Sequence, residues 1–85
     1  MKYEVRWTEN ALNSLKKLSR DVSKRIIEKV EEISEDPFRY VKKLKGFPLY
    51  SLRVGVYRAI LSIEAKNLVV FVVEVCHRRK IYRKY

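Results

Sequence analysis

The chain has 85 residues, a length that allows one domain, residues 1–85, around a single hydrophobic core. Its formal net charge is +10 and 47% of its residues are hydrophobic, so we expect neither an intrinsically disordered chain nor a membrane-spanning one. A single cysteine excludes an internal disulfide, and the charged segment MKYEVRWTEN lacks the apolar core of a signal peptide. These features predict a small soluble protein of the cytoplasm.

The first part of the chain predicts a strand followed by two helices. Charged and apolar side chains alternate in residues 2–7, which is the period of a half-buried strand. Thr8 suits a helix N-cap, and apolar residues follow at helical spacing as far as Leu18. Asp21 suits a second cap, and the helix after it ends before Pro37, because the residue before a proline is pushed out of the helical region. We expect the two helices to form an antiparallel hairpin.

The second part predicts three further strands. Residues 49–54 and 56–64 alternate apolar with polar side chains, and residues 68–76 are apolar almost throughout, as in a central strand. Gly55 and the segment at 65–67 supply turns, so these strands should form an antiparallel meander. The expected fold class is α+β with the order β-α-α-β-β-β. An antiparallel sheet combines the meander with the N-terminal strand, and the helical hairpin packs on one face.

Positive charge is concentrated in the second part of the chain. Residues 1–36 hold eight Lys or Arg and eight Asp or Glu, whereas residues 37–85 hold twelve Lys or Arg against Glu64 and Glu74. Charge that serves solubility alone is usually spread more evenly. The distribution therefore indicates a polyanionic partner, either nucleic acid or an acidic protein. An anionic membrane fits less well, because no helix expected here pairs a basic face with an apolar one.

Two arginines are expected on the face of the sheet opposite the helices. Arg53 and Arg58 each alternate out of phase with the apolar residues of their strands, and the short link between the strands makes them neighbours. Arg78 follows the last strand. An arginine cluster is costly unless an anion neutralises it, and only Glu64 and Glu74 are near in sequence. The pattern predicts a phosphate-binding face.

Several other kinds of site lack support. Two glycines, nine residues apart, do not form a Gly-rich phosphate loop. Cys76 and His77 are adjacent on a strand and point to opposite faces, so they predict neither a nucleophile pair nor a metal site, and Cys76 is expected to be a small buried hydrophobe. No spaced carboxylate pair occurs among residues 37–85, so neither a metal nor a cofactor is expected. Metal-free RNA cleavage remains, in which the substrate's own 2′-OH attacks the adjacent phosphate.

Proton transfer is the part of this reaction that arginines do not supply. Arginine suits stabilisation of the extra charge on the phosphorane, but its pKa above ~12 makes it a poor base. Tyr82 or His77 would then assist, because surrounding arginines favour phenolate over phenol and neutral over charged imidazole. The structural alternatives stay open: a packed or base-stacking tyrosine, and a hydrogen-bonded spectator histidine.

Four segments carry a resemblance to a known family: LKG before the second strand, LRVGVYRAILSI, the apolar fourth strand and HRRKIYR. Together they span nearly the whole chain and resemble the RelE family of bacterial and archaeal toxins. The pair RVGxYR and HRRxxYR is typical of the RelE/ParE superfamily, and HRRKIYR is more similar to RelE than to ParE. The resemblance implies a ribosome-dependent endoribonuclease that cuts mRNA in the A site and is neutralised by a RelB-type antitoxin.

The resemblance also implies roles for individual residues. Arg58 and Arg78 match arginines that stabilise the scissile phosphate, and Arg78 is further implied as proton donor to the leaving 5′-oxygen. Arg53 matches a basic residue of the second strand, and Tyr82 matches a tyrosine that orients, stacks on or helps to deprotonate the substrate. The implied RNA-binding residues are Lys42, Lys43, Lys45, Arg79, Lys80, Arg83 and Lys84.

One departure from the family pattern concerns the general base. Ser51 stands near the place of a second lysine in well-studied RelE members. The identity of the base is therefore open between Tyr82 and His77, and relatives with a histidine near this position use it in cleavage.

Three functional hypotheses follow. The first is an mRNA interferase that acts on the ribosome. The second is a non-enzymatic gyrase inhibitor of the ParE type, and the third is a catalytically degraded homologue that acts as a co-repressor and reaches operator DNA only through its antitoxin. Arg58, Arg78 and Tyr82 together favour the first, because gyrase binding does not require a phosphate-clamping face.

Overall fold

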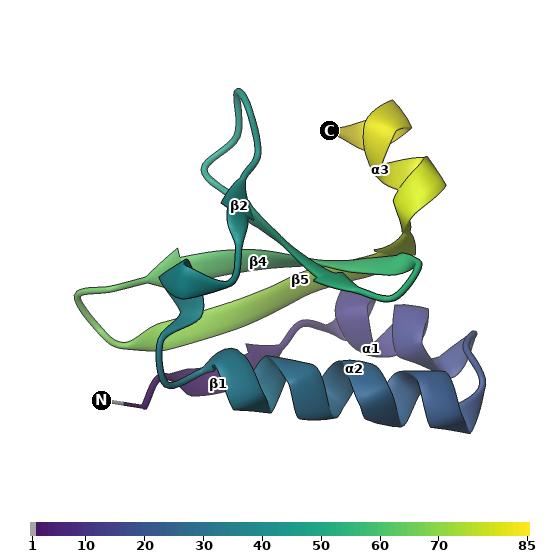
Figure 1. Ribbon diagram of the computed structural model, residues 1–85, viewed down its shortest axis with the longest axis horizontal. Helices are drawn as coiled ribbons and strands as arrows, with labels where there is room; N and C mark the ends of the chain where they lie inside the picture. The colour runs from purple at the N-terminus through teal and green to yellow at the C-terminus, as the bar shows by residue number, and fades with distance from the viewer. Residues whose placement is uncertain (1) are drawn as a thin grey trace.

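A computed structural model describes residues 2–85, apart from the side chain of Tyr82, and shows a five-stranded sheet flanked by helices. The elements are β1 (Glu4–Trp7), α1 (Glu9–Lys16), α2 (Arg20–Ile33), a 3-10 helix η1 (Pro37–Arg39), β2 (Lys42–Lys43), β3 (Tyr50–Val54), β4 (Tyr57–Glu64), β5 (Val69–His77) and α3 (Arg78–Lys84). In Figure 1, α1 and α2 lie on one side of the sheet, while α3 and the loop after β2 rise on the other. Within the described part of the chain, no helix has the length and apolar character needed to cross a membrane.

The predicted α+β class and the meander are confirmed, but the sheet is mixed. Strands β3, β4 and β5 pair antiparallel in sequence order, and the whole sheet has the order β1-β5-β4-β3-β2. The prediction of a wholly antiparallel sheet is wrong, because β1 pairs with β5 in parallel, from Glu4 opposite Val69 to Trp7 opposite Val72. Parallel neighbours need a long connection, and the helical hairpin and the meander together supply it here.

The helical hairpin begins and ends at capping residues. Thr8 is the predicted N-cap of α1, and its Oγ1 accepts a hydrogen bond from the Ala11 amide at 3.1 Å. For α2 the predicted cap Asp21 is wrong: Ser19 is the N-cap, and its Oγ accepts from the Val22 amide at 3.3 Å. Asp21 lies instead in the first helical turn, where its negative charge interacts favourably with the positive end of the helix dipole.

The hydrophobic core lies between the two helices and the sheet. Strand alternation directs Leu52, Ala59 and Val75 to this face, and they are 2%, 1% and 6% exposed. The helices contribute residues spaced by three, four or seven positions, so one apolar stripe of each helix is buried. The buried helical residues are Ala11, Leu15, Ile26, Val30 and Ile33.

Besides the short 3-10 helix η1, two elements have no counterpart among the predicted ones. Strand β2 pairs Lys42 with Ser51 and Lys43 with Tyr50, so the basic segment before the loop at 44–49 extends the sheet. Helix α3 comprises the basic segment that follows β5, and His77 caps it. Both elements belong to the side of the sheet that α1 and α2 leave uncovered (Figure 1), which we call the open face.

Two adjacent isoleucines of α2 test this packing. Ile26 is 1% exposed and Ile27 is 40% exposed. Ile26→Ala should lower the free energy of unfolding by about 2–5 kcal/mol, because it leaves a cavity between α2 and the sheet. Ile27→Ala, the matched control, should change it by less than about 1 kcal/mol. Urea denaturation with an unchanged m-value measures both, and equal effects would contradict this placement of α2.

Candidate active site

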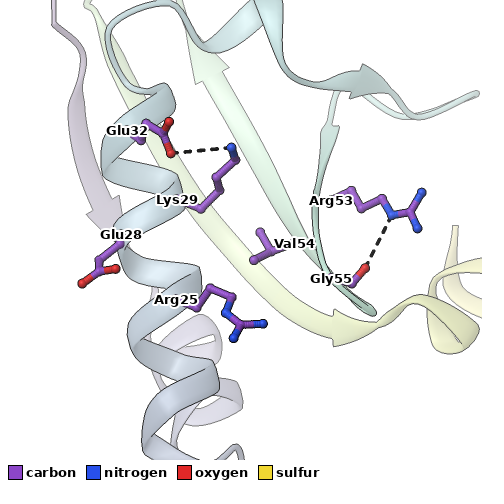
Figure 2. Close-up of a pocket in the computed structure, with 7 residues that line it drawn as sticks. All are labelled: Arg25, Glu28, Lys29, Glu32, Arg53, Val54 and Gly55. Atoms are coloured by element: carbon purple, nitrogen blue, oxygen red, sulfur yellow. Dashed lines mark hydrogen bonds and ion pairs between the residues drawn. The ribbon is translucent and has the colours of Figure 1, made fainter.

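Arg53 and Arg58 lie directly opposite each other on β3 and β4, as the sequence predicts for one shared face. Figure 2 shows Val54 directed toward α2 and Arg53 directed away from it. Like charges directly opposite each other destabilise a strand pair by about 0.2–1 kcal/mol. Among residues whose side chains are described, no acid forms an ion pair with either arginine. The pair is therefore a cationic site whose charge is available to an anion.

A basic cleft of about 230 Å³ lies beside Arg58 on the open face. One wall is the base of the 44–49 loop and the other includes Ile81 of α3, and Figure 1 shows the loop and α3 facing each other above the sheet. An edge-to-face contact between Phe47 and Tyr85, with 5.3 Å between ring centroids, joins the two walls. The cleft is lined by Lys42, Lys43, Leu44, Lys45, Ser51, Arg58 and Ile81.

Arg53 borders a second hollow outside this cleft. A groove of about 510 Å³ runs between α2 and the end of β3, and Figure 2 shows its lining residues. Its α2 wall carries both signs of charge, including the Lys29–Glu32 pair at 3.5 Å. A phosphate therefore gains more from the basic cleft, where the lining charges are all positive.

Ser51, which stands near the place of the lysine implied by the family resemblance, lines the basic cleft. It is 5% exposed, and its Oγ has no hydrogen-bond partner among the described residues. A hydroxyl at this place carries no charge and is a much weaker base than an amine, so Ser51 does not substitute for the missing lysine. The positive charge of the cleft comes instead from Arg58 and the lysines at its rim.

Arg78 begins α3 at the end of the sheet. Its amide donates to the Val56 carbonyl at 2.8 Å, which ties the start of the helix to the β3–β4 turn. The side chain of Arg78 is exposed, and no acid within the described part of the chain pairs with it. Tyr82 is carried by the same helix, but its side chain lies outside the described residues.

His77 lies on the other face of the sheet from Arg58. It is directly opposite Tyr57, whose ring it meets edge to face with 5.6 Å between centroids. Its Nδ1 accepts a hydrogen bond from the Arg79 amide at 3.2 Å, which caps α3. The structure therefore brings Arg53 and Arg58 together but does not bring His77 to them, and the spectator role is the one these contacts fit.

Cys76 lies directly opposite Arg58 and shares the open face with it. The prediction of a buried hydrophobe is wrong, because the residue is only partly buried. Burial raises the pKa of its thiol, and the Glu74 carboxylate raises it further, so the neutral thiol is favoured. Across the described residues, no group of three His, Cys, Asp or Glu side chains is placed to hold a metal ion.

Glu74 attaches α3 to the open face. Lys84 Nζ donates to one carboxylate oxygen at 2.7 Å, and the Tyr85 hydroxyl donates to the other at 3.0 Å. Glu74 was not predicted as part of the site, although an isolated acid within a basic segment was the available signal. Lys84, expected to bind RNA, is engaged in this ion pair instead.

The other predicted RNA-binding residues form two groups. Lys42, Lys43 and Lys45 line the basic cleft. A second group lies around a hollow of about 410 Å³ on α3, whose lining is His77, Arg79, Lys80 and Arg83. The first group therefore lies inside the cleft, whereas the second lies on α3 outside it, because Ile81 is the residue of α3 that lines the cleft.

Comparison with known families decides what kind of protein carries this site. The family described as ParE toxin of the type II toxin-antitoxin system parDE matches residues 5–82. The chain belongs to the RelE/ParE family of type II toxins. Toxin RelG of Mycobacterium tuberculosis is 32% identical over 99% of this chain and 100% of its own length. The mRNA interferase toxin RelE of Escherichia coli is 31% identical over 94% of this chain and 87% of its own length.

Solved structures of family members share the fold. A toxin-antitoxin complex RelBE2 of M. tuberculosis contains a chain with a TM-score of 0.85 and 30% identity, over 92% of this chain and 100% of that one. The archaeal RelE-RelB complex from Pyrococcus horikoshii gives a TM-score of 0.77 at 27% identity, over 92% of this chain and 97% of that one. The RelE-like toxin fold therefore carries the arginine pair and the basic cleft of this protein.

The hydroxyl of Tyr85 offers a spectroscopic test of the attachment of α3. Burial, followed by the hydrogen bond to Glu74, raises its pKa from 10.0 to about 12. Because the folded pKa lies above the unfolded one, this contact stabilises α3 fully below about pH 10 and is lost as pH rises through about 12. Phenolate absorbance, taken as wild type minus Tyr85→Phe, should titrate near the raised value, and Glu74→Gln should move it down. A midpoint at 10.0 in the wild type would contradict the contact.

Proposed function

We propose that this toxin is a ribosome-dependent endoribonuclease that cleaves mRNA in the A site. The observation that carries the proposal is the arginine pair on the open face, Arg53 opposite Arg58, beside a cleft whose charged lining residues are all cationic. A gyrase-binding surface needs no such phosphate clamp. The relative named mRNA interferase toxin RelE, at 31% identity, supports the same activity.

The proposed reaction needs no metal. The substrate 2′-oxygen attacks the adjacent phosphorus, its proton passes to a base, and the bond from phosphorus to the 5′-oxygen breaks as that oxygen receives a proton. Arg58 and Arg53 stabilise the extra negative charge of the phosphorane, which is the task that fixed cationic donors perform best. Arg78 is assigned to the leaving 5′-oxygen, and Tyr82, four residues later in α3, is assigned to the 2′-OH. His77 is the weaker candidate base because it lies on the other face.

The lysine rim and α3 hold the RNA in this proposal. Phosphates of mRNA and ribosomal RNA contact Lys42, Lys43 and Lys45 in the cleft, and Arg79, Lys80 and Arg83 around the separate hollow on α3. Contacts of this kind release counterions, so binding should weaken steeply as salt concentration rises. The protein acts in the cytoplasm, where it meets translating ribosomes.

The proposed protein partner is a RelB-like antitoxin. Related toxins have been solved in complexes with RelB from E. coli and P. horikoshii. A chain that covers the open face must neutralise its charge, so acidic residues are expected in the segment that binds there. This partner would suppress cleavage until it is removed.

Replacing Arg58 tests the phosphate clamp. Arg58→Ala should lower the rate of mRNA cleavage on ribosomes by roughly 10²–10³-fold, because one donor to the developing charge is lost. Arg20→Ala is the matched control, since Arg20 is an exposed arginine at the start of α2. Mapping new mRNA 5′ ends on translating ribosomes after addition of purified protein measures both variants.

The same mapping, combined with expression of the toxin in cells without its antitoxin and with an operator-binding assay, separates the alternatives. A folded Arg58→Ala variant with full cleavage activity would contradict the clamp. Growth arrest with DNA damage and intact mRNA would show a ParE-type gyrase inhibitor. Absence of both effects, together with antitoxin-dependent operator binding, would show a co-repressor.

Dependence on the ribosome gives a further prediction. The open face supplies charge but little that orients a flexible RNA strand, and orientation contributes strongly to catalysis. Free mRNA should therefore be cut slower than ribosome-bound mRNA by about 10² or more. Cleavage of the same labelled transcript with and without ribosomes measures the ratio, and equal rates would indicate an independent nuclease.

A further inference from the structure

Glu74 of β5 lies on the open face, beneath α3. It lies directly opposite Ile60 of β4, two residues from Cys76, which is opposite Arg58. Its side chain is 14% exposed, and its two oxygens accept separate hydrogen bonds from Lys84 and Tyr85. A carboxylate in this position thus links the floor of the site, next to the arginine pair, to the far end of α3.

Helix α3 depends on such a link. It has seven residues, five of them cationic, and a helix of this length is marginal in water without tertiary contacts. Its apolar contribution is Ile81, which is 5% exposed, and the open face below contributes Ile60, which is fully buried. Ile81 and the Glu74 carboxylate are therefore among the contacts that hold a strongly cationic helix against a cationic face.

The attachment also closes the cleft. Tyr85 donates to Glu74 and at the same time meets Phe47 of the 44–49 loop edge to face at 5.3 Å. One continuous set of contacts therefore runs from β5 through Tyr85 to the opposite wall. The contacts fix how far α3 stands from the loop, and hence the width of the cleft between them.

We propose that Glu74 is a positioning residue that holds α3 closed over the open face and so sets Arg78 and Tyr82 relative to Arg58. The proposal rests on the proposed endoribonuclease function. In this proposal Glu74 does not contact RNA. It acts only through its hydrogen bonds with Tyr85 and Lys84. The backbone of Arg78 is held by its hydrogen bond to Val56. The direction that α3 takes from this point therefore decides how far its catalytic residues lie from Arg58.

Electrostatics alone predicts the opposite result for loss of Glu74. Replacing an acid by a neutral residue makes the face more cationic, which should strengthen RNA binding and raise the rate. The positioning role predicts a slower reaction, because a displacement of the order of 1 Å in a catalytic group costs about 10²-fold. The sign of the effect therefore distinguishes the two explanations.

The test uses Glu74→Gln and Tyr85→Phe, with Glu64→Gln as the matched control. Glu64 changes the net charge by the same amount, and its hydrogen bond is to Asn67 in the β4–β5 turn, at the other end of β4 from Arg58. In single-turnover cleavage on saturating ribosomes, both test variants should react about tenfold more slowly than wild type, with an unchanged half-saturating ribosome concentration. Glu64→Gln should match wild type.

A second measurement needs no ribosome. Amide hydrogen exchange of residues 79–85 should become faster in Glu74→Gln and Tyr85→Phe, and should stay at the wild-type rate in Glu64→Gln. An effect on exchange that depended only on net charge would be the same in Glu74→Gln and Glu64→Gln.

Two results would overturn the positioning role. Wild-type or faster cleavage in both test variants would do so, and faster cleavage would show that α3 covers the site instead of completing it. If the wild-type protein cleaves mRNA and amide exchange of residues 79–85 is the same in both test variants as in wild type, Glu74 does not anchor the helix. A wild-type protein that leaves mRNA intact on ribosomes would instead overturn the proposed function itself.

Discussion

The register between β3 and β4 is the constraint on which the site depends. A two-residue turn that begins at Gly55 joins Val54 to Tyr57, and Gly55 has a φ of +62°, a conformation that other residues rarely adopt. A positive φ at the first central residue is the geometry of a type II′ turn, whose twist suits a hairpin. Side chains alternate along both strands, so this turn alone places Arg53 and Arg58 on one face. A slip of one residue would turn an arginine into the apolar core.

Alternation explains why so much of the site was predictable from the sequence. Between Leu52 and Leu61, the alternation of apolar and polar residues predicts which side chains face the helices and which face away. The parity continues into β5, where Cys76 shares the face of Arg58 and His77 faces Tyr57. The same rule of opposite faces that excluded a Cys–His pair, extended across the β4–β5 pairing, would also have separated His77 from the arginines.

The features that the sequence did not predict depend on contacts between distant segments. Parallel pairing of β1 with β5 leaves no local signal, because no turn joins the two strands. Strand β2 is a two-residue pairing of exposed lysines, without the apolar alternation that marks a strand. The basic segment of α3 has one buried apolar residue, Ile81, too few to mark a helix by its spacing, and the helix is also held by Glu74, which belongs to the preceding strand.

The charge distribution of the open face reflects two opposing requirements. A phosphate-binding cleft needs arginines whose charge is not already neutralised, yet α3, which carries five more cations, packs on the same face. Additional acids would hold this helix more firmly, but they would also compete with RNA for Arg53 and Arg58. Without any acid, a seven-residue helix would lose both side-chain hydrogen bonds to the sheet while like-charge repulsion remained. A single carboxylate at Glu74, occupied on both oxygens by α3 itself, meets both requirements, because it anchors the helix and leaves the arginines free.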